Sequence, residues 1–474
     1  MQTVNTRIAG AEVTDGRLVP VINPWDGSVV AEVREATDKN VERTLATGAA
    51  ATPVAAGLDA FARRQILERT RALLETHAEE LALLIQLEAG KPIALARGEV
   101  RRAQDVFAFA AMAVGGDGDL LDLSQSAFAA GRWGLVRRFP LGLVSAITPF
   151  NFPLNLVAHK LAPAIAAGCP IVIKPSPLAP LSAFRLVELV LEAGLPPPCV
   201  AVVMPTVADM APLVSDNRVK LLTFTGSAAV GWQLKAQAVR QKVALELGGN
   251  AAVLIAADAD LDRSVKAVAT GAFAYAGQSC ISVQRVFVHT AIADDFRARL
   301  LAHVRTHVRA GDPADPLTLC GPVINDAAAA RLGAWQAQAL AAGARLHVGG
   351  HGSGRALVPT VLEDVPDDQP LVQAEAFGPV LALATWTDWS DAWRRANASP
   401  YGLQAGVFTQ DIAAIWQTFD QLEVGAVIHN DVPTTRYDQM PYGGVKDSGV
   451  GREGPRYAIE EYTEPRMLVL RPGT

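Results

Sequence analysis

The sequence predicts an α/β protein in which a doubly wound parallel sheet is followed by a second α/β unit and a small element built of strands. Three observations support this fold class. Short apolar, β-branched runs alternate with helical patterns between residues 143 and 255, a second alternation covers about 257–445, and extended segments at 120–138 and 462–471 belong to neither. Strands that alternate with helices of this length form right-handed βαβ units and parallel sheets.

Two helices are predicted before the first sheet. Apolar residues recur at helical spacing from Asp59 to Gly90, and this glycine is followed by Lys-Pro, a sequence that ends helices. A second helical pattern covers about Gly98–Met112. We therefore expect one long helix over 59–90 and a shorter helix after it.

The first alternating region carries polar residues where its strands end. Helical patterns at Leu154–Ala167 and Leu181–Ala193 separate some of the strands. Ligands of parallel sheets bind beyond the carboxyl ends of the strands, and Asn151, Lys174 and Glu246 lie at or just past such ends. The predicted strands are Leu143–Thr148, Ile171–Lys174, Val200–Met204, Leu221–Thr225, Val243–Leu247 and Ala252–Ile255.

The length of the chain predicts more than one structural unit. A chain of 474 residues is too long for one simple core, so we expect two or three units. Residues 1–119 and 142–248 are predicted to form the first domain, and residues 249–450 the second. The extended segments, taken as 120–141 and 455–474, would form the strand-built element.

Composition excludes several classes of protein. A formal net charge of −6 over this length, without basic runs, argues against a nucleic-acid surface. The N-terminus has no apolar leader segment, and the most apolar stretch, 141–174, contains four prolines and reads as core rather than membrane span. We expect a cytoplasmic enzyme without a metal site, because the cysteines show no paired spacing. These are Cys169, Cys199, Cys280 and Cys320.

Three polar residues have the properties of an acyl-forming active site. Cys280 ends a Gly-Gln-Ser-Cys turn, where a thiol is exposed enough to act as a nucleophile. Glu246 begins a Glu-Leu-Gly-Gly-Asn turn and can serve as general base, and Asn151 lies between prolines and can stabilise an oxyanion. Each residue could instead have a structural role. Cys280 could be a small buried apolar residue, Glu246 a charge at a strand end, and Asn151 a turn former.

The ordered set Asn151, Glu246, Cys280 and Glu375 resembles the aldehyde dehydrogenase superfamily along nearly the whole chain. The resemblance implies oxidation of a small aldehyde with NAD or NADP, through a thiohemiacetal and a thioester on Cys280. Glu246 would activate the water that hydrolyses the thioester, which favours a free acid over a coenzyme A ester. A homodimer or homotetramer is also implied, with the extended segments pairing between subunits. The stretch Pro441–Gly449 matches as well and reads as loop packing.

The predicted cofactor site begins where a strand ends in Gly226-Ser227 and a helix opens. Amides at a helix N-terminus bind a pyrophosphate, although such a turn can also be a plain helix cap. By resemblance, Lys174 would meet the adenosine ribose, and Glu375 with Phe377 the nicotinamide ribose. A solvated strand end and a loop charge are the alternatives. The remaining predicted cofactor residues are Ile147, Thr148, Pro149, Phe150 and Leu247.

One departure from the family bears on the choice of cofactor. NAD-preferring members usually carry Glu three residues after the lysine, where this chain has Pro177. Without that carboxylate the repulsion of a 2′-phosphate is absent, so we expect NADP to be tolerated.

The substrate is predicted from the stretch Asn430–Asp438, which is similar to a subgroup acting on lactaldehyde, glyceraldehyde 3-phosphate and phosphonoacetaldehyde. Arg436 would lie at the substrate mouth and Arg102 would face the same funnel, because an arginine fork suits anionic groups. Phe152 and Ser279 flank the catalytic residues. We expect a small aldehyde with a hydroxyl or anionic group, and a structural role for either arginine is the alternative.

The main competing hypothesis is a cysteine hydrolase or acyltransferase that uses Cys280 and Glu246 without redox chemistry. None of the eight histidines stands in a motif that points to Cys280. Lys160 and Glu453 match a charged pair that relatives hold near the base.

Overall fold

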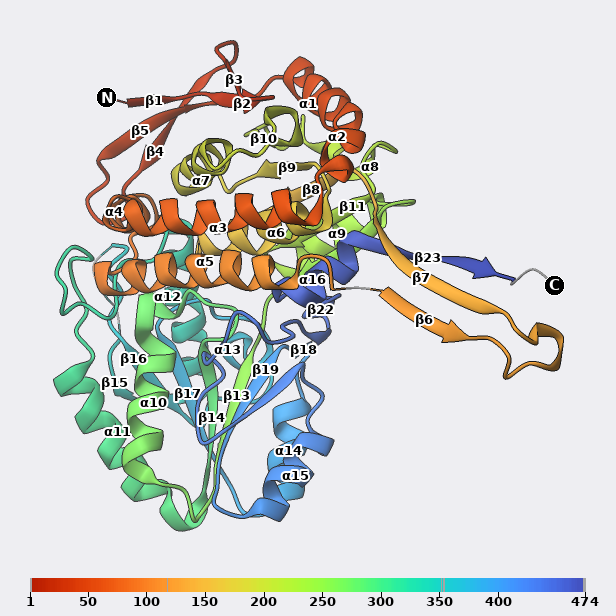
Figure 1. Ribbon diagram of the computed structural model, residues 1–474. Helices are drawn as coiled ribbons and strands as arrows, with labels where there is room; N and C mark the ends of the chain where they lie inside the picture. Colours follow the sequence, from red (N-terminus) through yellow and green to blue (C-terminus); the bar gives the residue numbers. More distant parts are fainter. Residues whose placement is uncertain (1, 117, 351, 353, 472–474) are drawn as a thin grey trace.

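Parallel strands at the centre of an eight-stranded sheet organise the N-terminal half of the computed structural model (Figure 1). The structure describes residues 2–116, 118–350, 352 and 354–471, so residues 1, 117, 351, 353 and 472–474 of the predicted domains lie outside it. The strand order is β22-β12-β11-β8-β9-β10-β2-β3, and the pairs from β12 to β10 are parallel. Their bounds are β2 Thr6–Ile8, β3 Ala11–Val13, β8 Val144–Ile147, β9 Ile171–Lys174, β10 Val200–Val202, β11 Leu221–Thr225, β12 Lys242–Glu246 and β22 Gly449–Val450.

Helices pack on this sheet and complete its core. The largest buried apolar cluster joins strands β8, β9 and β10 to α3–α7 and α16. A three-stranded sheet, β1-β5-β4, lies beside it. The bounds are β1 Gln2–Val4, β4 Leu18–Ile22, β5 Val29–Arg34, α1 Asp38–Ala50, α2 Thr52–Gly57, α3 Ala60–Thr76, α4 Ala78–Ala89, α5 Ile93–Ala113, α6 Asn155–Ala167, α7 Leu181–Glu192, α8 Ala211–Ser215, α9 Ala228–Gln237 and α16 Pro455–Tyr462.

The single helix predicted over 59–90 is two helices. The chain leaves helical geometry at His77, where φ is −100° and ψ is 20°, and α4 begins at the next residue. The His77 ring lies 2.7 Å from a Glu80 carboxylate oxygen, and Thr76 returns its hydroxyl to the Ala72 carbonyl. The apolar spacing runs on through both pieces and so hides the break.

A seven-stranded sheet, β15-β16-β17-β14-β13-β19-β20, organises the C-terminal half. The strand predicted at 252–255 is β13 of this sheet and not part of the first one, because the chain changes sheet in the turn after Glu246. The bounds are β13 Ala251–Ile255, β14 Val283–His289, β15 Arg345–Val348, β16 Thr360–Glu363, β17 Val380–Trp386, β19 Gln404–Phe408, β20 Ala426–His429, α10 Leu261–Phe273, α11 Ala293–His307, α12 Asp326–Ala341, α13 Pro370–Gln373, α14 Trp389–Asn397 and α15 Ile412–Gln421, with the pair β18 Tyr401–Gly402 and β21 Val445–Lys446.

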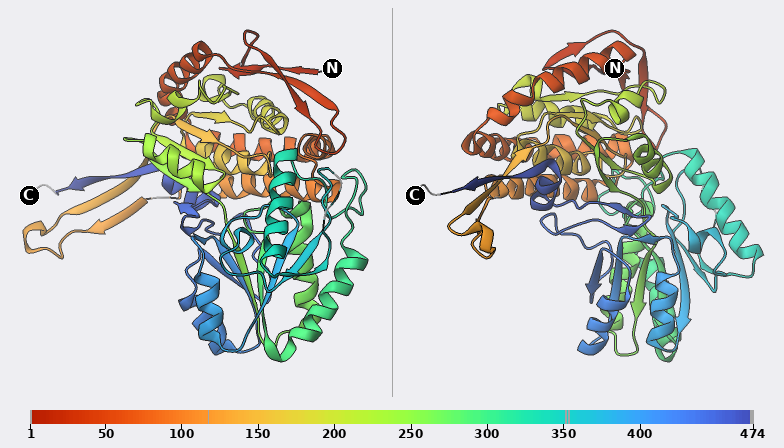
Figure 2. Two further views of the ribbon diagram at one scale, coloured as in Figure 1. Left: turned by 180° about the vertical axis from the view of Figure 1, so that it is seen from behind. Right: turned by 90° about the vertical axis from the view of Figure 1, so that its right-hand side faces the viewer.

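The predicted strand-built element is a separate sheet that projects from the body of the molecule (Figures 1 and 2). It consists of β6 Gly118–Asp122, β7 Trp133–Pro140 and β23 Thr463–Leu470, in the order β23-β7-β6. Both pairings are antiparallel, which confirms the two extended segments.

The division at residue 248 separates β12 from β13, which lie in different sheets. One difference is found at the far end of the second predicted domain, since β22 at 449–450 pairs with β12 of the first sheet.

Among the described residues no single helix is long and apolar enough to cross a membrane; one pair, Asp38–Gly57 with α3, meets the length and composition test only together and is bent by 109°.

Candidate active site

The polar residues predicted at strand ends lie along one edge of the first sheet. Strands β12, β11, β8 and β9 are neighbours in this order and end at Glu246, Thr225, Ile147 and Lys174. Ile147 pairs with Lys174, and Thr225 with Glu246. Parallel strands therefore bring residues from four distant parts of the chain to one edge, as predicted.

The turn after Glu246 brings the two sheets into contact at two glycines. A Cβ atom on Gly248 would lie 2.5 Å from the Glu375 carboxylate, and one on Gly249 would overlap the Cys280 carbonyl oxygen. The Gly249 amide also donates to Glu375 Oε1 at 3.1 Å. Only glycine permits so close an approach, and it places the Glu246, Cys280 and Glu375 segments side by side.

Cys280 follows a tight turn in left-handed backbone geometry. Tyr275 and Ala276 have φ of 53° and 54°, an unfavourable region for residues with side chains that is enriched at functional sites. Cys280 is partly exposed as a residue, and its sulfur lies 3.1 Å from the Tyr442 hydroxyl. Burial raises the pKa of Cys280 to about 12; Glu375 and Glu246 add to the rise, while Tyr442 and Arg436 oppose it. The free thiol is therefore protonated near neutral pH and needs a base to react.

The Asn151 amide lies against the same turn. Its Nδ2 donates to the Gln278 carbonyl oxygen at 3.0 Å, while its buried Oδ1 has no hydrogen-bond partner among the described residues. One amide hydrogen fixes the side chain to the segment that leads into Cys280. The second hydrogen can serve a ligand.

Glu246 is a buried carboxyl in a charged environment. Its Oε2 has no hydrogen-bond partner in the part of the chain that the structure describes. Burial raises the pKa of Glu246 well above the ordinary value of 4.5, nearby Glu453 raises it further, and Arg436 and Lys160 oppose the rise. Lys160 Nζ lies 3.1 Å from Glu453 Oε1, so the expected charged pair does stand near this carboxyl.

Arg436 lies deeper than a residue at a substrate mouth. Its side chain is only 5% exposed, and Nη2 donates to Glu453 Oε2 at 3.0 Å and lies 3.1 Å from His159 Nε2. The guanidinium carbon is 3.6 Å from the centre of the Tyr442 ring. An interior partner therefore already holds the charge predicted to meet an anionic substrate.

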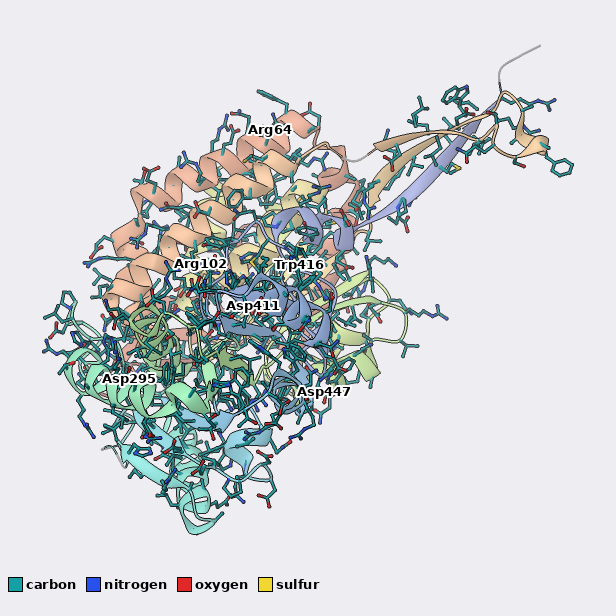
Figure 3. All side chains as sticks on the ribbon, turned by 90° about the horizontal axis from the view of Figure 1, so that it is seen from below. Arg64, Arg102, Asp295, Asp411, Trp416 and Asp447 are labelled. Carbon is teal, nitrogen blue, oxygen red and sulfur yellow. The ribbon has the colours of Figure 1, made fainter. Side chains whose placement is uncertain are left out.

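Arg102 lies on α5, where Figure 3 labels it, and its side chain is more exposed than that of Arg436. Its side chain is 29% exposed, lies over the Phe152 ring at 5.7 Å, and binds both oxygens of Asp438 at 2.7 and 2.9 Å. Ser279 and Phe152 are both partly exposed. The sequence analysis gave no role to Asp438, although this residue stands in the stretch that suggested the substrate class. Its partners come from distant helices, so no local pattern indicates them.

The residues predicted to hold a cofactor are only partly available. The Gly226 amide donates to the Glu246 carbonyl oxygen at 3.0 Å, so in this structure its hydrogen is already engaged by the protein. A Cβ atom here would lie 2.5 Å from the Phe224 ring, which explains the glycine. Ser227 precedes α9 and its hydroxyl makes no cap bond within the described chain, leaving the first turn of α9 open to an anion.

Several buried groups along this edge fit an NAD(P) molecule. The hydroxyls of Thr148 and Thr225 are buried without hydrogen-bond partners among the described residues, and such groups need a ligand or water. Burial lowers the pKa of Lys174 and raises that of Glu375 to about 7. The Phe150 and Phe377 rings meet edge to face at 5.8 Å. Of the other predicted cofactor residues, Pro149 directly follows Thr148, and Leu247 directly follows Glu246.

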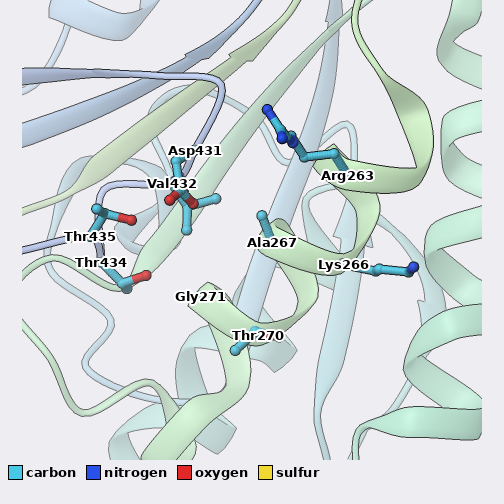
Figure 4. A pocket seen from close by; sticks show the side chains of 9 residues that line it. All are labelled: Arg263, Lys266, Ala267, Thr270, Gly271, Asp431, Val432, Thr434 and Thr435. Carbon is cyan, nitrogen blue, oxygen red and sulfur yellow. Dashed lines mark hydrogen bonds between the residues drawn. The ribbon is translucent and has the colours of Figure 1, made fainter.

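Part of the stretch 430–438 lines a cavity that includes neither Cys280 nor Glu246. This open cavity of about 510 Å³ lies between α10 and residues 431–435 (Figure 4). Within that stretch, only Arg436 and Asp438 reach the charged network beside Glu246. No group of three or more His, Cys, Asp or Glu side chains among residues 2–116, 118–350, 352 and 354–471 could hold a metal ion.

The fold agrees with comparisons against known proteins. The model of the aldehyde dehydrogenase family matches residues 11–468, and the chain belongs to this family. It is therefore an NAD(P)-dependent aldehyde dehydrogenase. The chain is 38% identical to the 3-sulfolactaldehyde dehydrogenase of Priestia aryabhattai over 467 residues, covering 98% of this chain and 97% of the relative.

Two solved structures are similar over nearly their whole length. Aldehyde dehydrogenase 21 from Physcomitrella patens, in complex with the reaction product succinate, has a TM-score of 0.97 and 41% identity, covering 99% of this chain and 98% of its own. Glyceraldehyde-3-phosphate dehydrogenase from Methanocaldococcus jannaschii, complexed with NADP, has a TM-score of 0.93 and 34% identity, covering 97% and 100%. Membership of this family favours an oxidoreductase over the cysteine hydrolase that we considered as the alternative.

Proposed function

We propose that this enzyme oxidises a small polar or anionic aldehyde to its carboxylic acid, with Cys280 as nucleophile, Asn151 as oxyanion donor and Glu246 as general base. The observation that carries the proposal is the contact of three segments at Gly248 and Gly249. That contact supports a thiol close to a buried carboxyl, and the hydrogen bond from Asn151 to the Gln278 carbonyl oxygen holds a partly free amide against the same turn. These groups together can form and hydrolyse a thioester.

The first half-reaction forms the carbon–sulfur bond. The Cys280 proton leaves for the Glu246 carboxylate, and the sulfur attacks the aldehyde carbon to give a thiohemiacetal oxyanion. The free Asn151 N–H and the Cys280 backbone N–H would donate to this oxyanion, and one such donor is worth about 3 kcal/mol in the barrier. When bound, the nicotinamide supplies the acceptor for the hydride that leaves the same carbon.

The second half-reaction consumes the thioester. Glu246 first releases the Cys280 proton to solvent, then takes a proton from water, and the resulting hydroxide attacks the acyl carbon. The carbon–sulfur bond breaks, the acid leaves, and Glu246 returns the water proton to the Cys280 thiolate. A carboxyl with a raised pKa suits this step because its conjugate base is a stronger proton acceptor near neutral pH.

The substrate class rests on the relatives and on Arg102. The 3-sulfolactaldehyde dehydrogenase is named for an anionic aldehyde, and the similar solved structure holds succinate. Arg102 is the more exposed of the two predicted arginines and stands beside Phe152. We therefore propose an aldehyde of two to four carbons whose anionic tail meets Arg102, while Arg436 acts from the interior.

Cofactor choice follows from Pro177, which is exposed three residues after Lys174. Since proline brings no carboxylate to repel a 2′-phosphate, we propose that NADP is accepted. Initial rates with each cofactor at low concentration test this, and turnover with NAD alone would contradict it.

The test of the proposed function is a set of short aldehydes supplied with either cofactor and followed by the absorbance of the reduced nicotinamide. Cys280→Ser should abolish the signal with every aldehyde. Cys169→Ser is the matched control, because Cys169 is a buried thiol whose bond to the Tyr462 carbonyl a serine can keep. Aldehyde oxidation by Cys280→Ser at the rate of the control would sink the proposal.

A further inference from the structure

A phenol that the reaction described above does not use lies against the nucleophile. The Tyr442 hydroxyl is 3.1 Å from Cys280 Sγ, and its ring is buried beside Ile281 and Leu403. From the sequence, the stretch that contains Tyr442 is interpreted as loop packing. The contact with the sulfur instead places a hydrogen-bond donor at the reacting atom.

Two neighbours fix the orientation of this ring. The Tyr442 and Glu453 backbones exchange hydrogen bonds of 3.1 and 2.6 Å, and Glu453 in turn holds Arg436 at 3.0 Å. The Arg436 guanidinium then covers the ring at 3.6 Å. A cation over the face of a phenol draws electron density from the ring and makes its O–H a better donor.

The charges around the sulfur show why a donor matters there. Glu246 and Glu375 both disfavour ionisation of Cys280, and Arg436 is the cation that favours it. Burial raises the pKa of Tyr442 well above its ordinary value, so the phenol keeps its proton at neutral pH. A thiolate beside it can only accept.

We propose that Tyr442 is a catalytic residue that donates a hydrogen bond to the Cys280 thiolate, with Arg436 as the residue that positions its ring. The inference rests on the proposed role of Cys280 as nucleophile. The thiol proton goes to Glu246, and the phenol neither gains nor loses a proton. When the sulfur bonds to carbon it loses its charge, and the phenol hydrogen bond weakens.

The test measures the thiol directly, without aldehyde or cofactor. The full-length protein is alkylated with iodoacetamide over a range of pH, and mass spectrometry follows the peptide that contains Cys280. Tyr442→Phe removes one hydroxyl and should raise the pH midpoint of alkylation, with about 10-fold slower reaction near neutral pH, as expected for a lost bond to a charged group. Tyr437→Phe is the matched control, since Tyr437 is 64% exposed and only five residues away.

Each outcome decides the inference. An unchanged midpoint in folded Tyr442→Phe would overturn it, and so would loss of the fold, which would show that the hydroxyl serves stability rather than the sulfur. Tyr437→Phe should match the wild type. The proposed function is judged separately, because it fails through Cys280→Ser whereas this inference fails through Tyr442→Phe.

Discussion

Glu246 combines a buried carboxyl with a task that requires its ionised form. Burial raises its pKa and Glu453 adds to the rise, so the base is lost as pH falls through a value above the ordinary 4.5. We predict an acid limb in the pH profile of thioester hydrolysis. Glu246→Gln should slow this step by about 100-fold or more and remove the limb, as measured by single-turnover kinetics. An identical limb in the variant would assign it to another group.

Gly249 sets the distance between the base segment and the nucleophile. Because a Cβ atom here would overlap the Cys280 carbonyl oxygen, Gly249→Ala must displace the backbone that carries the sulfur. We predict loss of most aldehyde oxidation and a fall in stability of about 1–3 kcal/mol, measured by turnover and denaturant unfolding. Gly57→Ala is the control: a Cβ atom on Gly57 meets nothing within 4 Å, so this variant should keep both.

Local sequence predicted the residue types of the site but not all their contacts. Cys280, Glu246 and Asn151 stand in short motifs, and their strand-end positions follow from the alternation of elements. By contrast, the Gly226 amide is occupied by a carbonyl from a neighbouring strand, and Arg436 by a carboxylate 17 residues away. Such partners depend on tertiary packing, which the spacing of residues within a motif does not predict.

Among the elements, α7 begins in an unusual way. It has no capping side chain of its own, and Glu88 of α4 accepts from the amides of Leu181 and Ser182 at 2.5 and 2.9 Å and from the Ser182 hydroxyl. Burial raises the pKa of Glu88 to about 7, although these bonds oppose the rise. A carboxyl from a distant helix thus accepts from the first backbone amides of α7, which would otherwise be buried without a hydrogen-bond partner.

We predict that Glu88→Ala lowers the free energy of unfolding by about 1–3 kcal/mol, because two buried amides lose their acceptor. Glu88→Gln keeps an acceptor and isolates the charge. Because the pKa of Glu88 is higher in the folded protein than in the unfolded chain, the protonated carboxyl stabilises the fold. This stabilisation is fully present below pH 4.5, the pKa in the unfolded chain, and is lost as the pH rises to about 7. The melting temperature of the wild type relative to Glu88→Gln should therefore decline across that interval. A constant difference would contradict the assignment.

Element types were easier to predict than element partners. The strands Ile171–Lys174 and Leu221–Thr225 have the predicted bounds, since β-branched runs between helices are a strong signal. The break at His77 was missed, because it depends on a single residue within an unbroken apolar pattern. The N-terminal strands β1–β5 were not predicted either, being short and only partly buried.

For the molecule as a whole, the projecting sheet is the feature least explained by one chain. Its strands expose many apolar side chains, and patches of this kind mark interfaces. We infer that the sheet pairs with another subunit in a homodimer or homotetramer. The exposed residues include Leu120, Leu121, Trp133, Leu135, Met467, Leu468, Val469 and Leu470.

Light scattering of the purified protein should give a mass of at least two chains. Leu468→Glu puts a charge at the centre of β23, where the side chain is 56% exposed, and should shift the protein toward the monomer. Phe61→Glu is the control, being 72% exposed on α3, and should leave the mass unchanged. A monomeric wild type would remove the basis for this interpretation.

The bond between the Gly226 amide and the Glu246 carbonyl oxygen has a practical consequence for enzyme engineering. The peptide of Glu246, the proposed general base, is tied to the Gly226-Ser227 turn that opens α9 and that we expect to lie at the cofactor. Replacing that turn would therefore also shift the proposed general base for thioester hydrolysis. Libraries aimed at a new coenzyme should vary both segments together and be screened for turnover as well as affinity.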